Sequence, residues 1–389
     1  MVSLQHFPPI SAIAAGHKLS VSITGANRLA AILKLIEDSK QSLRLFFYIF
    51  GHDETSIRVR DALIDAINRG VTVCLLVDGF GTAERDDSVY APLIEAGVGF
   101  ARFHSSWGRR YLLRNHQKII VADEKRALVG GSNIVGHYFS DDPQGASWHD
   151  LCLTIEGDAA VKLARYFDDL QSWMMGKRRS LKRLLQIFQQ HSDKAGPFRI
   201  LHGGPFRRLS PLTRSIKLDL HGTRRLDMIQ AYFAPNRGML ERLTRVAGRK
   251  GGHARLITAA RSDNETTIAA ARHCYGRLLR GGVQIYEYAP QMLHMKLIVA
   301  DEITYIGSAN FDMRSLYINA EVMVRIVDRD FANQMVAFID HHVPACNAIT
   351  LESHTASSSW LQRLGRRLAY YLVSTVDFTV TRGISLRRR

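Results

Sequence analysis

The chain contains an internal repeat, and this duplication limits its possible folds more than any other feature of the sequence. Residues 43–50 have the pattern of a buried strand, 55–70 carry apolar side chains at helical spacing, and 71–78 again resemble a strand. The same order of strand, helix and strand recurs in the second half, at residues 226–233, 238–252 and 253–259. The sequence therefore predicts two homologous α/β halves.

Each half ends in a predicted hairpin that opens with His-x-Lys. The hairpins cover residues 116–133 and 294–310, and both follow the pattern His-x-Lys-x4-Asp, then a short apolar strand and Gly-Gly/Ser-x-Asn. Because side chains alternate along a strand, the His and Lys of each motif share one face. A solvated strand edge would explain one such motif, but its recurrence at equivalent points of a repeat favours a functional site. The residues concerned are His116, Lys118, His294 and Lys296.

Strand pairing across each hairpin is expected to bring the closing Asn back beside the His. A three-residue turn at 124–126 would place Asn133 beside His116. A two-residue turn at 302–303 would likewise return Asn310 to His294. The motif acids would then lie at the turns, where Asp commonly accepts backbone hydrogen bonds. We expect these acids to be structural rather than catalytic; they are Asp123 and Asp301.

Two His, two Lys and two Asn side chains suit phosphodiester chemistry. One imidazole can attack phosphorus while the other protonates the departing alcohol. Lys and Asn can stabilise the charge that develops on the non-bridging oxygens. An acid follows each motif, Asp150 in the first half and Glu321 in the second, and a carboxylate bonded to one ring nitrogen leaves the other nitrogen free to react. This scheme requires no metal, and we expect no cofactor.

The two hairpins resemble the paired His-Lys-Asp motifs of the phospholipase D superfamily. The resemblance runs from about residue 23 to residue 335 and is closest to bacterial cardiolipin synthases of the type that lacks N-terminal transmembrane helices. Gly131 stands where the second motif has Ser308, a candidate substrate-binding residue, so the first motif lacks one hydroxyl donor. The strings that carry the resemblance include RGVTVCLLVDGFGT (69–82), WHDLCLTIEG (148–157) and GSANFDMRSLYINAEV (307–322).

The resemblance implies two phospholipase D-like halves, each a mixed β-sheet flanked by helices, packed as a pseudo-dimer with one active site between them. It implies a phosphohistidine intermediate, with His116 as nucleophile and His294 as general acid and base, an order that the pseudo-symmetry leaves open. Asp150 would orient His116, and Glu321 would orient His294. A loop at 105–115 is a candidate cap over the site. The side chains expected to bind phosphate are Lys118, Lys296, Asn133 and Asn310.

The net charge of +16 is confined to two segments. Residues 176–225 carry +11 and residues 360–389 carry +6, whereas the rest of the chain is nearly neutral. Amphipathic helical patterns at 176–190 and 360–373 suit an anionic bilayer surface, although their apolar faces could instead pack on the core. We therefore divide the chain into an N-terminal half, a basic linker with an amphipathic helix, a C-terminal half and a basic tail, at residues 1–175, 176–225, 226–350 and 351–389.

These features predict a cardiolipin synthase-like phosphatidyltransferase that transfers a phosphatidyl group to phosphatidylglycerol. The alternative is a phospholipase D that releases phosphatidic acid; a nucleic-acid phosphodiesterase or a non-catalytic lipid-binding protein fits less well. Nucleic acid is not an expected partner, because the basic segments lack interleaved stacking aromatic residues. Scattered cysteines, no bilayer-spanning apolar run and no export signal predict a cytoplasmic enzyme, peripherally bound to the inner face of the cell membrane. We expect a monomer with phospholipid substrates.

Overall fold

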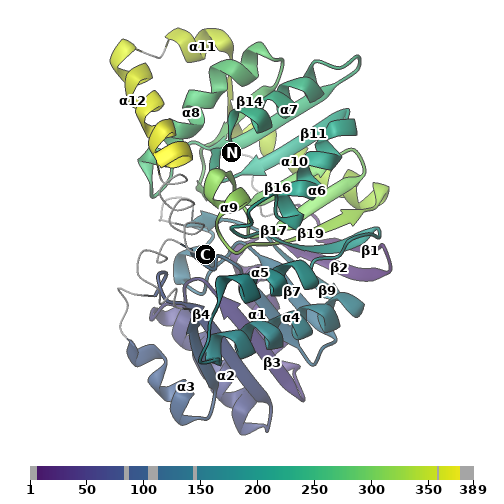
Figure 1. The fold of residues 1–389 in the computed structure, drawn as a ribbon, viewed down its shortest axis with the longest axis vertical. Helices are drawn as coiled ribbons and strands as arrows, with labels where there is room; N and C mark the ends of the chain where they lie inside the picture. Colours follow the sequence, from purple (N-terminus) through teal and green to yellow (C-terminus); the bar gives the residue numbers. More distant parts are fainter. Residues whose placement is uncertain (1–6, 83–86, 104–112, 143–146, 357–358, 377–389) are drawn as a thin grey trace.

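Two eight-stranded mixed sheets, one in each half of the chain, form the framework of the protein (Figure 1). The structure is a computed structural model that describes residues 7–82, 87–103, 113–142, 147–356 and 359–376. The first sheet runs in the order β1 (Ile10–Ala14), β2 (His17–Ser22), β9 (Cys152–Glu156), β7 (Arg126–Gly130), β6 (Ile119–Ala122), β3 (Ser42–Phe47), β4 (Thr72–Asp78) and β5 (Gly99–Phe103). The second runs in the order β10 (Phe198–His202), β19 (Val322–Val327), β17 (Ile303–Gly307), β16 (Lys296–Ala300), β11 (Arg225–Gln230), β13 (His253–Ala259), β14 (Gln284–Tyr288) and β20 (Cys346–Ile349).

The two sheets share one topology. Strands β2, β9, β7, β6, β3, β4 and β5 correspond in order to β10, β19, β17, β16, β11, β13 and β14. In each sheet the strands of the predicted repeat are parallel, and the first strand of the motif hairpin, β6 or β16, runs antiparallel to them. The predicted fold of two homologous α/β halves with mixed sheets is confirmed. Two small parallel pairs complete the strands: β8 (Trp148–His149) with β15 (Met292–Leu293), and β12 (Phe233–Ala234) with β18 (Phe311–Asp312).

Helices cover the sheets, and their ends are fixed by local side chains. The crossover helix of each repeat begins at an N-cap: Asp53 accepts a hydrogen bond from the Ser56 amide, and Asn236 accepts one from the Met239 amide. The helices are α1 (Gly25–Glu37), α2 (Glu54–Asn68), α3 (Ala91–Glu95), α4 (Asp158–Met175), α5 (Leu181–Gln190), α6 (Pro211–Gly222), α7 (Arg237–Ala247), α8 (Glu265–Arg280), α9 (Met313–Tyr317), α10 (Arg329–His342), α11 (Leu351–Ala356) and α12 (Trp360–Tyr371).

One continuous apolar core joins the two halves. It contains Val129 of β7 and Ile306 of β17 together with Leu163 of α4 and Phe338 of α10, all fully buried. Separate apolar clusters lie under the outer helices of each half. Burying apolar area stabilises a packed arrangement, so this shared core holds the two halves together.

The apolar face of the predicted basic helix at 176–190 is not available to a membrane. Leu184, Ile187 and Phe188 of α5 are at most 1% exposed and belong to the core shared by the two halves. Full burial of each side chain contributes about 1.5–3 kcal/mol, so exposing this face would be costly. Of the two alternatives left open for residues 176–190, a bilayer surface or core packing, the apolar face of α5 follows the second. Strand β10, also within the basic linker, pairs with β19 of the second sheet.

The second amphipathic pattern has the opposite environment. Helix α12 packs on α8, with Ala369 buried and the Tyr370 ring stacked on His273 at 4.8 Å. Its apolar side chains point away from this contact: Trp360 is 67% exposed and Leu361 60%. None of the described helices is both long and apolar enough to cross a bilayer. The rest of the predicted basic tail, residues 377–389, lies outside the described residues.

Both hairpin turns begin one residue earlier than predicted. Ala122 pairs with Arg126, so the first turn is 123–125, and Ala300 pairs with Ile303, so the second is 301–302. The motif acids explain the shift, because each takes a left-handed backbone conformation, with φ of 53°. The Asp123 carboxylate accepts backbone hydrogen bonds from residues 40–42, and Asp301 accepts them from residues 224 and 225.

Candidate active site

The two His-x-Lys motifs meet between the halves, because each is bonded to the opposite half. The backbone amide of His116 donates to the Ala320 carbonyl at 2.9 Å. The amide of His294 donates to the His149 carbonyl at 2.8 Å, next to the pairing of β8 with β15. Each motif histidine is thus placed beside the residue that precedes the acid of the other half.

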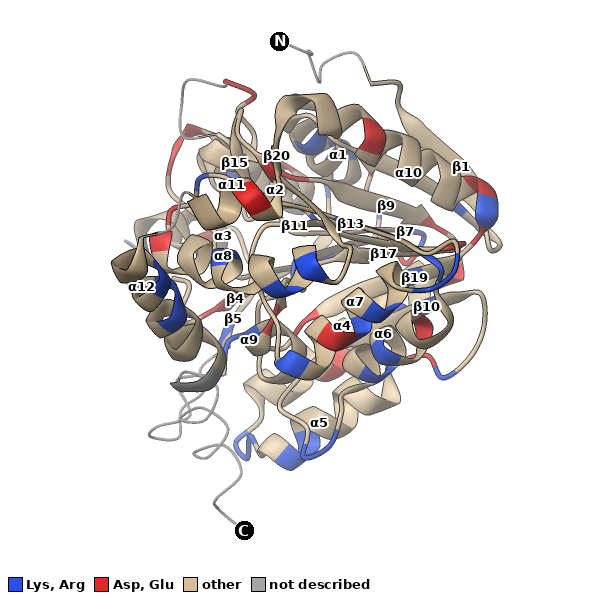
Figure 2. Cartoon of the chain, turned by 90° about the horizontal axis from the view of Figure 1, so that it is seen from above, with Lys and Arg blue, Asp and Glu red and all other residues tan. Residues whose placement is uncertain are grey.

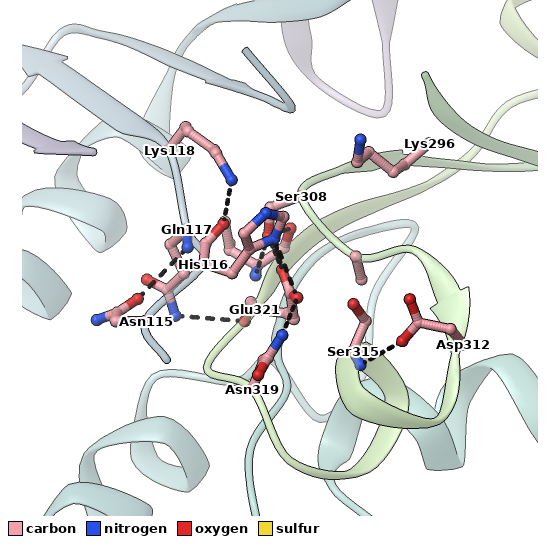
Figure 3. A network of polar contacts seen from close by, with 12 residues as sticks. Asn115, His116, Gln117, Lys118, Lys296, Ser308, Asp312, Ser315, Asn319 and Glu321 are labelled. Carbon is pink, nitrogen blue, oxygen red and sulfur yellow. Dashed lines mark hydrogen bonds and ion pairs between the residues drawn. The ribbon is translucent and has the colours of Figure 1, made fainter. Parts of the chain in front are cut away.

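This crossing reverses the expected pairing of acids and histidines. Nδ1 of His116 lies 3.2 Å from the Glu321 carboxylate, and Nδ1 of His294 lies 2.7 Å from Oδ2 of Asp150 (Figure 3 shows the former). The expectation that Asp150 orients His116 and Glu321 orients His294 is therefore wrong. It assumed that each acid stays with its own half, whereas the backbone pairing carries each acid to the partner motif.

A serine hydroxyl anchors each acid. Oγ of Ser308 donates to the Glu321 carboxylate at 2.5 Å, and Oγ of Ser132 donates to Oδ2 of Asp150 at 3.1 Å. The Ser308 side chain is fully buried and also accepts from the Val322 amide, so it positions Glu321 rather than offering a hydroxyl to a substrate. The sequence predicted that the first motif lacks this hydroxyl because Gly131 replaces the serine, but Ser132, the next residue, supplies it.

The structure also explains why glycine occupies position 131. A Cβ atom on Gly131 would lie 2.6 Å from Oδ2 of Asp150, closer than carbon and oxygen can approach. The carboxylate fills the space that a side chain would need. Gly131 therefore makes room for the Asp150–His294 pair.

Both motif lysines are enclosed beside the histidines. Nζ of Lys118 donates to the His116 carbonyl at 2.7 Å, and Nζ of Lys296 donates to the His294 carbonyl. Burial lowers the pKa of Lys118 to about 7 and that of Lys296 to about 8. Burial also lowers the pKa of both imidazoles, His294 to about 3, and each imidazole is further repelled by both lysines. Because both lysines act on both imidazoles, the two motifs form one electrostatic site.

The two asparagines lie in different surroundings. Oδ1 of Asn133 accepts from the Ile49 amide at 3.0 Å, and its Nδ2 donates to the Tyr138 hydroxyl at 3.1 Å. Tyr138 contacts His294, not His116, with ring centroids 5.0 Å apart. The position of Asn133 beside His116 stays a prediction; the Ile49 amide that bonds Asn133 follows Tyr48, whose ring borders His116. Asn310 is 5% exposed, and its Oδ1 has no hydrogen-bond partner among the described residues.

Aromatic rings that sequence reasoning did not single out enclose both imidazoles. The Tyr48 ring lies 5.1 Å from His116 between centroids, and Nζ of Lys118 lies 5.4 Å from the centre of the same ring. Trp148 lies 4.9 Å from His294, nearly perpendicular to it. Trp148 begins the string WHDLCLTIEG (148–157), one of those that carry the family resemblance, so its position there was the available signal.

Two buried charges that sequence reasoning missed support the backbone of the site. Arg28, 1% exposed, donates to the backbone carbonyls of Tyr138, Trp148 and Asp150, and so fixes the segment that presents the acid. Asp78, at the end of β4, accepts from the Asn115 amide at 2.7 Å, directly before the first motif. Nothing local in the sequence marks Arg28 as a support of the site, because Tyr138, Trp148 and Asp150 lie more than 100 residues away from it.

The pKa values of the two acids are shifted in opposite directions. Burial raises the pKa of Glu321 to about 7, although Lys118 opposes this effect. Burial acts on Asp150 in the same direction, but His294 and Lys296 outweigh it and keep the pKa of that carboxyl below its usual value. An ionised Asp150 requires a proton on Nδ1 of His294, which leaves Nε2 free.

Among the described residues, no three His, Cys, Asp or Glu side chains are grouped as metal ligands would be.

Two homologous halves with paired His-Lys motifs at their interface define an enzyme of the phospholipase D type. Residues 32–171 and 220–343 match the family model described as "Cardiolipin synthase, PLD-like domain", one segment in each half. The chain belongs to this family.

Curated relatives and a solved structure agree with that assignment. The chain is 30% identical over 345 residues to a cardiolipin synthase of Geobacillus sp. (strain WCH70), covering 87% of this chain and 68% of the relative. It is 28% identical over 361 residues to cardiolipin synthase A of Pseudomonas fluorescens, covering 91% and 74%. The crystal structure of phosphatidylserine synthase from Haemophilus influenzae has the same fold, with a TM-score of 0.71, 13% identity and coverage of 97% of this chain and 98% of that one. The protein is thus an enzyme of the phosphatidyltransferase and phospholipase D type.

Proposed function

We propose that the protein forms cardiolipin by transferring a phosphatidyl group to phosphatidylglycerol through a phosphohistidine. In the first step, Nε2 of His116 attacks phosphorus, the bond from phosphorus to the headgroup oxygen breaks, and His294 gives that oxygen its proton. In the second step, a hydroxyl of phosphatidylglycerol gives its proton to His294 and attacks phosphorus, which frees His116. The crossed pairs of imidazole and carboxylate carry this proposal, because they leave one Nε2 in each motif free to react.

The difference between the two acids supports the order of roles. His294 lies 2.7 Å from a carboxylate that stays ionised, and an ionised partner favours the imidazolium that a general acid must be. His116 lies 3.2 Å from a carboxyl whose pKa burial raises to about 7, so its imidazole gains less from protonation and stays neutral as a nucleophile. An anionic phosphodiester offsets the repulsion by the lysines and lets His294 take up its proton.

The lysines and Asn310 are the proposed ligands of the phosphoryl group. Lys118 and Lys296 place two donors beside both imidazoles in a buried site, where a charge-assisted hydrogen bond is stronger than in water. The amide of Asn310 adds a neutral donor. Asn133 instead supports Tyr138, whose ring borders His294.

We further propose that α12 binds the surface of an anionic membrane, at its inner face in the cell. Along this helix Trp360, Leu361, Leu364, Leu368 and Tyr371 form an exposed apolar stripe, all at least 47% exposed. Arg363 and Arg367 are exposed beside the stripe (Figure 2 shows the basic residues of α12). An apolar face flanked by arginines is the pattern of an interfacial helix. Since one chain supplies both motifs, we propose that a monomer is the active form.

The products formed from labelled phosphatidylglycerol test the proposed reaction. Transfer yields cardiolipin and glycerol, whereas hydrolysis yields phosphatidic acid and glycerol. We expect cardiolipin as the main product of the wild type and no product from His116→Ala. Phosphatidic acid as the main product would replace the proposed transferase by a hydrolase of the same mechanism, and turnover by His116→Ala would refute the role of His116.

A further inference from the structure

A basic cavity lies within the linker segment, formed by residues other than those of the paired motifs. It has a volume of about 610 Å³ and lies between the end of α5, strand β10 and the start of α6. Volumes of roughly 300–1,000 Å³ are typical of small-molecule sites. Figure 2 shows that Lys and Arg residues gather on α5, α6 and the segments beside them. The cations that line the cavity are Lys194, Arg199, Arg207, Arg208 and Arg214.

The positive charge of this cavity is not neutralised by its own acid. Asp193 also lines the cavity, but its Oδ1 pairs with Lys162 at 2.9 Å and its Oδ2 accepts from the Ile200 amide. Arg208 and Arg214 are exposed and form no ion pair with a described residue. The cavity thus keeps a strong excess of positive charge, which favours an anion.

One guanidinium of the lining has an unused donor. Arg199 donates to Ser215 Oγ and to the Lys194 carbonyl. Its Nε is enclosed and has no hydrogen-bond partner among the described residues. Its two terminal nitrogens are held by the Lys194 carbonyl and Ser215 Oγ, so the guanidinium is fixed in the wall of the cavity. Arginine forks match phosphate oxygens particularly well.

Apolar side chains form much of the remaining lining. Leu201 is buried, Phe206 and Leu209 are half-buried, and Leu218 at the side is 67% exposed. Inorganic phosphate would gain nothing from this apolar surface, whereas a lipid places acyl or glycerol carbons beside its phosphate. The lining therefore combines the two chemistries of a phospholipid.

We propose that this cavity binds the phosphate-bearing headgroup of an anionic phospholipid, as a second lipid site apart from the paired His-Lys motifs. The site would hold a lipid without transforming it as the paired motifs do, because none of the described residues that line the cavity is a histidine. The basic residues of the linker would then bind an anion while the apolar face of α5 stays packed in the core. The proposal does not depend on which reaction the paired motifs catalyse.

Photolabelling with peptide mapping tests this site directly. The probe is a photoreactive short-chain phosphatidylglycerol, used as a monomer in solution with the full-length protein. The test variant is Arg208→Gln/Arg214→Gln, and the matched control is Lys182→Gln/Arg183→Gln, which removes the same charge from exposed positions of α5 that do not line the cavity. We expect labelling of residues 189–218 in the wild type and the control, and labelling at least about tenfold lower in the test variant, which is about 1.4 kcal/mol.

Three results would overturn the proposal. Equal labelling of the wild type and the test variant would show that the cavity arginines do not hold the lipid. An equal loss of labelling in the test and control variants would show that the probe responds to the overall positive charge of this surface and not to the cavity arginines. Competition by inorganic phosphate or glycerol 3-phosphate as strong as that by unlabelled dihexanoyl phosphatidylglycerol would assign the site to a soluble phosphate.

Labelling of residues 189–218 should persist in His116→Ala, so failure of the proposed reaction and failure of this site remain distinguishable. Unchanged melting temperatures of the variants would show that they fold.

Discussion

Asp150 in the first half of the repeat lies 2.7 Å from Nδ1 of His294 in the second half. Glu321 of the second half likewise contacts Nδ1 of His116 in the first, so in neither half is the motif histidine paired with an acid of the same half. The two halves must therefore pack correctly before either imidazole is oriented. This dependence explains how a duplicated fold gives one site rather than two.

Replacing Asp150 tests this crossed arrangement. In Asp150→Asn the partner of His294 loses its charge and can no longer stabilise the imidazolium, so we expect kcat to fall by up to about 10⁴-fold, the loss seen when the carboxylate that orients a catalytic histidine is replaced by an amide. Steady-state kinetics on a phospholipid measure the effect. Combining Asp150→Asn with His294→Ala should cost little beyond His294→Ala alone, since the two residues act as a unit. Full additivity of the two losses would contradict the pairing.

Gly131→Ala should disrupt the same pair sterically. The added methyl group would lie 2.6 Å from Oδ2 of Asp150 and must push the carboxylate away from His294. We expect kcat to fall at least about tenfold, because displacements of 1 Å near reacting groups commonly have such effects. Gly222→Ala, where a Cβ meets no atom within 4 Å, is the control and should keep wild-type activity. Wild-type turnover by Gly131→Ala would show that Asp150 is not constrained as described.

The buried lysines should make stability depend on pH. Burial lowers the pKa of Lys118 from 10.5 to about 7, so between these values the unfolded chain binds more protons than the folded protein. The contribution of Lys118 to the free energy of unfolding therefore rises with pH from about 7 to 10.5. We expect Lys118→Met to be more stable than the wild type at pH 7, with the difference shrinking by pH 9. Urea unfolding at the two pH values measures it, and a difference that does not change with pH would contradict the burial of a neutralisable lysine.

Membrane binding should depend on the exposed face of α12. Leu361→Asp/Leu368→Asp removes apolar contact and adds charge, so we expect binding to vesicles containing phosphatidylglycerol to fall at least about tenfold in a sedimentation assay. The control Ile13→Asp/Ile94→Asp changes two apolar side chains elsewhere that are 83% and 52% exposed. Activity on a soluble phosphodiester should stay unchanged in both variants. Equal loss of binding in test and control would remove α12 as the membrane contact.

Much of the fold could be predicted from the sequence because each strand and helix of the repeat has its own pattern of apolar and polar residues. The strand at 253–259 has the predicted bounds, and the crossover helices lie within the predicted ranges or one residue beyond them. The two motifs were recognisable because His-x-Lys recurs at equivalent positions. These signals depend on residues close in sequence, which is why they can be read without the structure.

The features that were missed depend on contacts between distant residues. The crossed pairing of Asp150 and Glu321 follows from how the halves pack, and nothing near either acid specifies it. The helices at 181–190 and 360–371 have similar basic, amphipathic patterns, yet Leu184 is buried in the core while Leu361 is exposed. The hairpin register shifted because Asp123 and Asp301 bond to backbone amides far away in sequence, which fixes their left-handed conformations.

Identification of the covalent intermediate tests the central claim most directly. The donor would be a ³²P-labelled phosphatidyl ester of p-nitrophenol, whose alcohol leaves without needing a proton from His294. After an alkaline quench, which preserves phosphohistidine, we predict that the label lies on His116 in the wild type and accumulates in His294→Ala, where the acceptor hydroxyl cannot be deprotonated. His116→Ala should carry no label. A label on His294 that persists in His116→Ala, or cardiolipin formation without any covalent label, would contradict the proposed mechanism.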